Sequence, residues 1–590
     1  MSVLLVAINS KYSHTNLAVR SIAGYVKENL PEVNIKFDEW TIQEPILNIL
    51  RGIKEHKPRV VIFSVYIWNC QVCYSVAEEL KKIAPEVLIG AGGPEVSYKG
   101  AEFFANNPSF DFLVKGEGEK ITLELCKILC GKSELLKELY KYDIENPKEY
   151  YFENLKSFIK YNFLLDLSLF KLDLISDLSV LPFPYPEFLQ NNLGQNPFGP
   201  AAHPENRILY YESSRGCPFS CSYCLSSIDK TVRFMPLERV FADLKIFLDG
   251  KVKLVKFVDR TFNLNESRYL QIWEFIKNNY NGVTRFHFEI AAECLSDKAL
   301  DFIKEMPENS IQFEIGVQSI NHETLDEVGR KVDLENLARI ISKIPNFIHV
   351  HLDLIAGLPY ESLEKFRKSF DFTFKLKPNM LQLGFLKILE GTKMATFAEN
   401  HGFKYLSVPP YEVLETPDIS WEDLVFLKDI ELLNDEFWNS GKFVKLFEYL
   451  LLKEDFSPFD FYVSLMEYAK ISEKFETALS QAHKTDFWFD LVYSYFAEKK
   501  SEENILILDL IKFDYISMGK TSTFPAWYNH IYSKDAHHQA LLEYDDMHST
   551  RLAYANSNYE EFSVNPKTFE KVPSKILFLY NKNNTKSIVL

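Results

Sequence analysis

The sequence predicts an α/β protein with a Rossmann-like N-terminal domain, a partial (β/α)6 barrel and a mostly helical C-terminal domain. Two long stretches alternate apolar, strand-like runs with amphipathic helical segments, which is the pattern of parallel sheets. From about residue 411 the apolar residues instead recur at helical spacing. A chain of 590 residues is also too long for one hydrophobic core. We therefore divide it into residues 1–135, a linker of residues 136–203, a barrel of residues 204–410 and a C-terminal domain of residues 411–590.

The composition is that of an ordinary globular protein, with 46% hydrophobic and 25% charged residues. No run of eighteen uncharged apolar residues is present, and the first apolar run lacks a basic flank, so we expect a cytoplasmic protein without a membrane span. The 8 cysteines are scattered and do not form a disulfide framework, which favours a reducing and anaerobic setting. The net charge of −16 argues against a general nucleic-acid binder without excluding a local basic groove.

In the N-terminal domain the expected strands are Val3–Ile8, Asn34–Phe37, Val60–Val65, Val87–Ala91 and Phe110–Val114. Ligands of such sheets bind outside the carboxyl ends of the strands, and glycine there permits close approach of a large flat ligand. The candidate ligand residues at these ends are Asn9, Lys11, Tyr12, Ser64, Tyr66, Trp68, Gly92, Gly93, Pro94, Glu95, Val96, Gly116, Glu117 and Gly118. Tight turns would give the same glycine pairs for purely structural reasons.

The linker lacks this alternation of strands and helices. It begins with a Lys/Glu/Tyr-rich stretch, continues through Leu181-Pro-Phe-Pro-Tyr-Pro and has further prolines at 197 and 200, followed by one at 204. Because proline fixes extended or turn geometry, we expect an ordered segment that wraps between the domains.

In the barrel the expected strands are Ile208–Glu212, Leu254–Val258, Arg285–Ala291, Ile311–Gly316, His349–Ile355 and Met380–Phe385. Active residues are expected at the carboxyl ends of barrel strands. Acceptors and backbone edges suited to a cationic, ribose-bearing ligand lie there: Asp259, Glu293, Gln318, Ser319 and Gly357. Strand-end capping is the alternative interpretation of each.

The most informative motif follows the first barrel strand and reads Cys217-x3-Cys221-x2-Cys224. A four-iron cluster held by three thiolates keeps one iron open for a substrate or cofactor. The alternative is a zinc knuckle, but zinc requires a fourth Cys or His at short spacing, and none follows within the next twenty residues. The motif therefore favours a [4Fe-4S] cluster.

With the aromatic Tyr223 before its last cysteine, this motif resembles that of the radical S-adenosylmethionine (SAM) superfamily. Gly92-Gly-Pro-Glu-Val96 and Gly116-Glu-Gly-Glu119 precede it, and the whole chain is similar to the cobalamin (B12)-binding radical SAM enzymes. The resemblance implies that the open iron chelates SAM, which is cleaved to methionine and a 5'-deoxyadenosyl radical. It also implies SAM contacts from Tyr223 and the five barrel acceptors named above, and cobalamin contacts from the N-terminal loop residues.

The Asp-x-His-x-x-Gly motif of other B12 proteins is absent. The resemblance therefore implies base-off cobalamin without a histidine ligand, its lower face covered by side chains such as Tyr66 or Trp68. We interpret His14 as a hydrogen-bonding loop histidine, with axial ligation as the alternative, and Cys70 and Cys73 as structural.

These features predict a C-methyltransferase in which SAM is both the radical source and, through methylcobalamin, the methyl donor to an unactivated carbon. The alternatives are rearrangement, ring contraction or cyclisation without methyl transfer, and a cobalamin or redox sensor. An electron donor such as flavodoxin or ferredoxin is implied. The substrate class stays open between a modified tRNA nucleoside, a peptide and a small metabolite, and no catalytic acid or base is assigned.

The C-terminal region resembles an uncharacterised extension on one branch of this family and is expected to cap the barrel mouth. Its expected helices are Trp421–Ser440, Phe443–Leu451, Phe459–Ser472, Lys484–Glu498 and Glu502–Tyr515. Beyond residue 520 we expect aromatic-rich loops and short strands. His530, His537 and His538 are interpreted as surface or loop histidines, with metal binding as the alternative.

Overall fold

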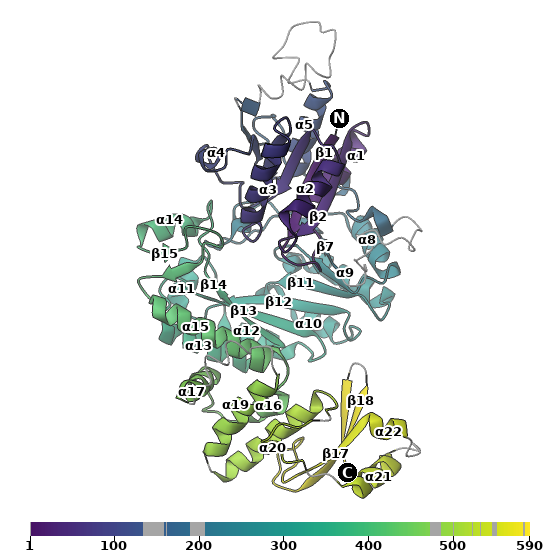
Figure 1. Cartoon of the computed structure of the whole chain (residues 1–590), viewed down its shortest axis with the longest axis vertical. Coiled ribbons are helices and arrows are strands. Elements are labelled where there is room, and N and C mark those ends of the chain that lie inside the picture. Colours follow the sequence, from purple (N-terminus) through teal and green to yellow (C-terminus); the bar gives the residue numbers. More distant parts are fainter. Residues whose placement is uncertain are drawn as a thin grey trace. The chain divides into compact units, whose positions relative to one another are not determined.

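The computed structural model describes residues 2–133, 159–160, 162–188, 207–471, 485–499, 501–521, 523–530, 533–544, 551–581 and 584–590. The chain forms two compact units (Figure 1), one of residues 1–361 with 384–420 and the other of residues 362–383 with 421–590. The Lys/Glu/Tyr-rich part of the predicted linker (136–158) and the prolines at 197, 200 and 204 lie outside the described residues.

The N-terminal domain is a parallel sheet with strand order β2-β1-β3-β4-β5-β6. Its strands are β1 (Ser2–Asn9), β2 (Asn34–Thr41), β3 (Val60–Ser64), β4 (Leu88–Gly92), β5 (Phe112–Val114) and β6 (Leu164–Leu165). The helices are α1 (Leu17–Asn29), α2 (Ile46–Glu55), α3 (Cys70–Ile83), α4 (Glu102–Asn106) and α5 (Gly118–Leu129). Because β1 lies between β2 and β3, the winding reverses there, and the loops after β1 and β3 flank a topological switch point.

Burial explains why these residues form a two-sided parallel sheet. The side chains of β1 are buried from Val3 to Asn9, as expected for a strand with helices on both faces. Helices α1 and α5 lie side by side on one face, while α2 and α3 pack together on the other (Figure 1). Cys70 and Cys73 lie on the buried face of α3 and belong to the hydrophobic core, which agrees with their structural interpretation.

The second sheet has the order β14-β13-β12-β11-β10-β7, with parallel pairing from β7 to β13. This confirms the predicted open barrel. Its strands are β7 (Ile208–Tyr211), β10 (Leu254–Phe257), β11 (Arg285–Ile290), β12 (Ile311–Gln318), β13 (His349–Ala356) and β14 (Met380–Phe385). The helices between them are α8 (Leu237–Asp249), α9 (Glu266–Asn279), α10 (Asp297–Ile303), α11 (His322–Glu327), α12 (Leu334–Lys343) and α13 (Leu363–Lys375).

The barrel strands alternate between a buried apolar face and a polar face. Val255 and Phe257 are buried, as are Phe286 and Phe288 on the next strand. The residues between them on the polar face include Lys256, His287, Glu289, Glu314, His351 and Asp353. Since alternate side chains point to opposite faces of a strand, the apolar set packs under the helices and the polar set lines the lumen.

The described part of the linker contributes strand β6 to the N-terminal sheet and contacts the first barrel strand. Tyr185 is fully buried; its hydroxyl donates to the backbone carbonyl of Tyr210 (2.8 Å) and accepts from the amide of the same residue (2.8 Å). Thr15, in the loop after β1, lies 3.2 Å from the same hydroxyl. The linker therefore joins the first barrel strand to the N-terminal domain by hydrogen bonds.

The second unit is mostly helical, as predicted, and ends in an antiparallel sheet of order β17-β18-β19. Its remaining elements are α15 (Trp421–Asn434), a π-helical turn (Asp435–Asn439), α16 (Val444–Leu450), α17 (Pro458–Ile471), α19 (Thr485–Glu498), α20 (Glu502–Ser517), α21 (Lys534–Tyr544), α22 (Arg551–Ala555), β17 (Ser557–Phe562), β18 (Ser574–Asn581) and β19 (Asn584–Val589). Within the described ranges, no helix combines the length and apolarity that crossing a bilayer requires.

Of the histidines interpreted as surface or loop residues, His530 lies in a loop, but His537 differs from the expectation. His537 and His538 lie on α21 and not in a loop, and His537 is buried with its ring 2.9 Å from the Ser557 hydroxyl. The ring of His530 contacts the fully buried Glu560 at 2.6 Å. The sequence prediction failed here because only the β17 partners, distant in sequence, reveal which face of the segment is covered.

We expect Gly93→Ala to destabilise the N-terminal domain by at least about 2 kcal/mol, because strained backbone and steric overlap act together. Gly93 has φ +108°, and an added Cβ would lie 2.5 Å from the carbonyl oxygen of Val65. Thermal unfolding with limited proteolysis would measure the loss. Gly116→Ala is the matched control: its φ is +77°, but a Cβ there meets nothing within 4 Å, so the cost should stay near about 1 kcal/mol. Equal losses in both variants would contradict the steric argument.

Candidate cofactor-binding site

The three cysteines of the predicted cluster loop follow the short strand β8 (Ser214–Arg215), which pairs with β9 (Arg233–Phe234). Cys217 is buried, Cys221 and Cys224 are partly exposed, and all are free thiols. The Cys217 amide donates to the Asp229 carbonyl (3.0 Å), and Gly216, at φ +97°, packs directly against the Thr231 backbone. The loop is thus held at both ends by backbone contacts.

The three thiols lie near one another. Burial raises the pKa of the Cys221 thiol, Arg330 lowers it, and the neighbouring Cys224 and Cys217 raise it further. Among the residues that the structure describes, no three His, Cys, Asp or Glu side chains form a site for a single metal ion. In an iron–sulfur cluster each thiolate binds a different iron. The free, adjacent thiols of this loop fit such a cluster.

Asp259 anchors the segment that leads into this loop. It is fully buried, and its carboxylate accepts hydrogen bonds from the Ser213 amide (2.7 Å), the Ser213 hydroxyl (2.6 Å) and the Ser214 hydroxyl (2.7 Å). Burial raises the pKa of Asp259 to about 6 despite these bonds. Every described hydrogen bond of Asp259 therefore goes to the chain before the cysteines, and its contact with SAM stays a prediction.

A buried hydrogen-bond acceptor without a partner lies at the carboxyl end of β12. The strand bulges between Gly316 and Gln318, and Gln318 adopts φ +70°. The Oε1 atom of Gln318 is buried with no partner, and its amide occupies the space that a side chain at 316 would fill. Arg330 donates to the Gly316 carbonyl (2.7 Å) and bonds the Tyr223 hydroxyl. Since buried acceptors are normally paired, this one is available to a bound molecule.

Asp353 on β13 is a second unpaired acceptor that sequence reasoning missed. It is the register partner of Gly316, and its Oδ1 atom is buried without a partner. Burial, with smaller effects from Glu314 and Glu289, raises the pKa of Asp353 to about 8. The signal was the alternation His349-x-His351-x-Asp353, a polar face on an otherwise apolar strand, whereas the prediction considered only the residues after each strand.

The other predicted SAM residues surround these acceptors in different ways. Glu293 is exposed on the turn Ala292–Cys294, and its charge acts on Arg330. Ser319 is buried and donates to Glu361 (2.6 Å). Gly357 follows β13 at φ +84°. Gln318, Tyr223, Arg330 and Glu293 thus gather beside the cysteine loop, and Ser319 is occupied by the protein.

The predicted cobalamin residues lie at the carboxyl ends of the N-terminal strands, and several of them are available to a ligand. The rings of Tyr66 and Trp68 stack at 4.3 Å, and Trp68 is 47% exposed. Lys11 and Tyr12 are exposed, with the Arg207 guanidinium 4.4 Å from the centre of the Tyr12 ring. Of the remaining predicted residues, Gly92, Gly93, Pro94, Gly116 and Gly118 provide backbone at this edge, and Asn9 and Ser64 are buried at strand ends. The aromatic pair, the exposed loop and the glycines suit a large flat ligand such as a corrin.

Two carboxylates from this predicted set are instead occupied within the protein. Glu95 is buried and accepts a hydrogen bond from the Tyr411 hydroxyl, while Val96 is fully buried in the core. Glu117 forms ion pairs with Arg233 (2.6 Å) and Arg215 (3.3 Å).

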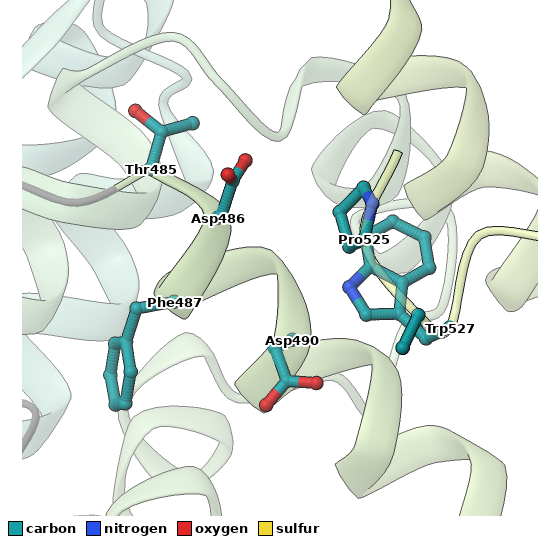
Figure 2. Close-up of a pocket in the computed structure, with 7 residues that line it drawn as sticks. Thr485, Asp486, Phe487, Asp490, Pro525 and Trp527 are labelled. Carbon is teal, nitrogen blue, oxygen red and sulfur yellow. The ribbon is translucent and has the colours of Figure 1, made fainter. Parts of the chain in front are cut away.

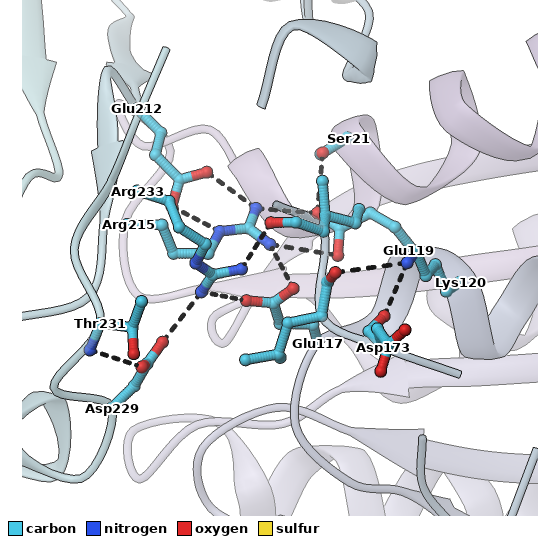
Figure 3. A network of polar contacts seen from close by, with 12 residues as sticks. Ser21, Glu117, Glu119, Lys120, Asp173, Glu212, Arg215, Asp229, Thr231 and Arg233 are labelled. Carbon is cyan, nitrogen blue, oxygen red and sulfur yellow. Dashed lines mark hydrogen bonds and ion pairs between the residues drawn. The ribbon is translucent and has the colours of Figure 1, made fainter. Parts of the chain in front are cut away.

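Figure 3 shows the network to which Glu117 belongs. Arg215 also pairs with Glu119 (2.9 Å) and Glu212 (2.8 Å), and Ser21 donates to Glu119 (3.1 Å). Burial opposes ionisation of Glu119, but Arg215 holds the pKa of this carboxyl below its usual value. Because Arg215 lies two residues before Cys217, the Gly-Glu-Gly-Glu segment of the N-terminal domain fixes the start of the cluster loop.

His14 is placed as the sequence indicated, in a hydrogen bond. Its Nδ1 atom lies 2.5 Å from the Tyr210 hydroxyl, and burial lowers the pKa of the imidazole. The bond ties the loop after β1 to the first barrel strand.

A separate cavity lies in the second unit. It has a volume of about 540 Å³ and is lined by Thr485, Asp486, Phe487, Asp490, Pro525, Ala526 and Trp527 (Figure 2). None of the predicted site residues lines it, and the described contacts of Asp486 include an accepted hydrogen bond from Tyr515 (3.0 Å).

Comparison with known families assigns three segments. Residues 3–125 match the B12 binding domain, residues 211–373 match the radical SAM superfamily, and residues 399–590 match a protein family of unknown function, DUF4080. The chain therefore combines a B12 binding domain with a radical SAM domain and carries an additional DUF4080 region.

Two curated relatives are similar over about two thirds of the chain. An uncharacterised methyltransferase, PH0819 of Pyrococcus horikoshii, is 25% identical over 397 residues, which is 65% of this chain and 78% of that protein. The cobalamin-dependent radical SAM methyltransferase TokK of Streptomyces tokunonensis is 24% identical over 422 residues, 69% of this chain and 58% of TokK. The chain thus spans less than two thirds of TokK.

Solved structures share the fold. The cobalamin-dependent SAM radical enzyme OxsB, with aqua-cobalamin and SAM bound, superposes with a TM-score of 0.54 at 14% identity, covering 88% of this chain and 84% of OxsB. The radical SAM methyltransferase TsrM of Kitasatospora setae, with cobalamin and a [4Fe-4S] cluster bound, gives 0.50 at 14% identity, covering 70% of this chain and 82% of TsrM.

We expect Glu119→Gln to destabilise the first unit by about 2 kcal/mol, because it removes one of the three carboxylates that compensate the buried Arg215 guanidinium. The cluster loop should loosen as well, so iron and sulfide content after anaerobic reconstitution should fall. Thermal unfolding and metal analysis would measure both effects. Glu32→Gln, in an exposed ion pair with Lys132 on the same domain, is the control and should change stability by less than about 0.5 kcal/mol. The same iron content in both variants would show that the ion-pair network does not help to position the cluster loop.

Proposed function

We propose that this protein transfers a methyl group from SAM, by way of cobalamin, to an unactivated carbon of its substrate. In this proposal SAM serves both as radical source and as methyl donor. The observation that carries it is the joint placement, within one compact unit, of a free three-thiol loop, two unpaired buried acceptors and the loops of a switch-point crevice. The two methyltransferases described above support methyl transfer as the output.

The residues of the chain would divide the work as follows. Cys217, Cys221 and Cys224 would hold the [4Fe-4S] cluster, and Gln318 with Asp353 would accept hydrogen bonds from SAM. Tyr66, Trp68 and the glycines of the N-terminal strand ends would border cobalamin. When bound, these groups supply one-electron chemistry and methyl carriage, while the protein provides binding and orientation.

Fixed geometry is the main contribution that the structure supports. Asp259 holds the residues before the cysteines through three hydrogen bonds, and Arg215 ties them to the N-terminal domain. A radical made in the barrel must meet its methyl donor without diffusing away, so the two binding regions must keep a constant separation. The hydrogen bonds of His14 and Tyr185 to Tyr210 help to keep that separation constant.

We further propose that cobalamin binds base-off and without a histidine ligand. The support is that His14, the histidine at the switch-point loop, is already bonded to Tyr210. Electron paramagnetic resonance of the Co(II) form should therefore show no nitrogen coupling on cobalt. If coupling appears and disappears in His14→Ala, the assignment fails.

The decisive test of methyl transfer is isotopic. The full chain, reconstituted anaerobically, would be supplied with methyl-deuterated SAM, cobalamin, a flavodoxin- or ferredoxin-type reductant and cell fractions of RNA, peptides and metabolites. We expect S-adenosylhomocysteine and 5'-deoxyadenosine in comparable amounts and a labelled methyl group in one product, and neither SAM cleavage nor label in the Cys217/Cys221/Cys224→Ala variant. 5'-Deoxyadenosine with a rearranged, unlabelled product would instead establish ring contraction or cyclisation.

A further inference from the structure

The cavity of the second unit has no role in the proposed function. Its volume of about 540 Å³ lies within the range of sites that bind small molecules or single side chains. One wall is the beginning of α19, with Asp486 and Asp490, and the other is the loop between α20 and α21, with Pro525 and Trp527 (Figure 2). The cavity is therefore formed within one compact unit.

The Trp527 side of the cavity is held in place by aromatic packing. The indole ring stacks on Tyr493 with ring centres 4.6 Å apart, and Phe489 lies parallel to it at 6.4 Å. Tyr515 packs edge-on against it at 5.5 Å. A side chain fixed in this way loses little conformational freedom when a ligand binds.

This indole carries a hydrogen-bond donor that the protein does not use. The Nε1 atom of Trp527 is buried and has no partner among the described residues. Figure 2 shows the nitrogen-bearing edge of the ring on the side that faces α19. Because buried indole nitrogens are normally hydrogen-bonded, an occupant that brings an acceptor oxygen to this edge would satisfy the donor.

The opposite wall is negatively charged. Asp486 and Asp490 are one helical turn apart, so they lie on the same side of α19. The Tyr515 hydroxyl donates to Asp486 (3.0 Å) and takes only one of the acceptor positions of that carboxylate. The lining residues that the structure describes include no Lys, Arg or His, so the cavity favours a cation over an anion.

A guanidinium group suits the two walls better than an ammonium group. It is planar, its several donors can reach both carboxylates, and it stacks on flat rings such as indole. The acceptor for Trp527 must come from the same molecule, and the backbone carbonyl of an arginine residue provides one. A nucleotide base also offers donors and an acceptor, but its phosphate would meet two carboxylates and no basic lining residue.

We propose that this cavity binds an arginine residue of a peptide or protein. The guanidinium lies between Asp486 and Asp490, and a backbone carbonyl accepts a hydrogen bond from Trp527 Nε1. The DUF4080 region, residues 399–590, thereby gains a recognition function of its own. The inference does not depend on methyl transfer, because no cofactor or reacting carbon takes part in it.

The test measures the binding of three small probes to the full chain, reconstituted anaerobically with cluster and cobalamin but without reductant. The probes are Nα-acetyl-arginine methylamide, its neutral citrulline analogue, and n-butylguanidinium, which lacks the carbonyls. Saturation-transfer NMR would give their affinities. We expect the arginine probe to bind, the citrulline analogue to bind at least about tenfold more weakly and butylguanidinium to bind about threefold more weakly.

Variants of the two walls separate the two contacts. Asp486→Asn and Asp490→Asn should each weaken binding of the arginine probe at least about tenfold. Trp527→Phe keeps an aromatic ring but removes the N–H group, so the arginine probe and butylguanidinium should then bind equally. Glu422→Gln, at an exposed position on α15 outside the cavity, is the matched control and should bind as the parent protein does.

Thermal unfolding should be unchanged in all four variants, which shows that they are folded. Equal binding of the citrulline analogue, or unchanged binding in both Asp variants, would overturn the proposal. A preference for the arginine probe over butylguanidinium that persists in Trp527→Phe would overturn the carbonyl contact. Tighter binding of guanosine 5'-monophosphate than of the arginine probe would assign the cavity to a nucleotide instead. Since no turnover is measured, failure of the isotopic test leaves this result separate.

Discussion

The buried guanidinium of Arg215 is surrounded by carboxylates from two regions of the chain, Glu212 from the barrel and Glu117 with Glu119 from the N-terminal domain. A cation at this depth is tolerable only while those partners remain in place. The folded N-terminal domain therefore helps to position the cluster loop, and these ion pairs are among the contacts that join the two domains within one compact unit. The cysteines begin two residues later, so the same constraint positions the chemistry.

The polar side chains of the barrel fall into two groups, those that are paired within the protein and those that keep an unpaired oxygen. Lys256, His287 and Glu314 neutralise one another, and Asp259 is satisfied by Ser213 and Ser214. Gln318 and Asp353, by contrast, each keep a buried oxygen without a partner. Unpaired buried oxygens are rare in folded proteins, so those that survive next to a thiol loop mark where other molecules supply the missing contacts.

Much of this arrangement was predictable from the sequence. Parallel strands reveal themselves as short apolar runs between amphipathic helices, and the strand-end glycines and the cysteine spacing are local signals. The roles of Glu95 and Glu117 were not predictable, because their partners Tyr411 and Arg233 are more than a hundred residues away. Asp353 was not predicted because its unpaired state depends on the side chains of neighbouring strands such as β12. The burial of His537 likewise depends on β17, which follows it in the chain.

The hydrogen bond from Tyr411 to Glu95 has a consequence for how this architecture is inherited. The DUF4080 region begins at residue 399, yet residues 399–420 belong to the first unit, and Tyr411 closes over a buried carboxylate of the B12 binding domain. An ancestor that gained or exchanged this region by recombination at its sequence boundary would have altered the loop after β4 in the same event. The extension and the loop after β4 should accordingly have evolved as one module. A substitution at position 95 should therefore be accompanied by a compensating substitution at position 411.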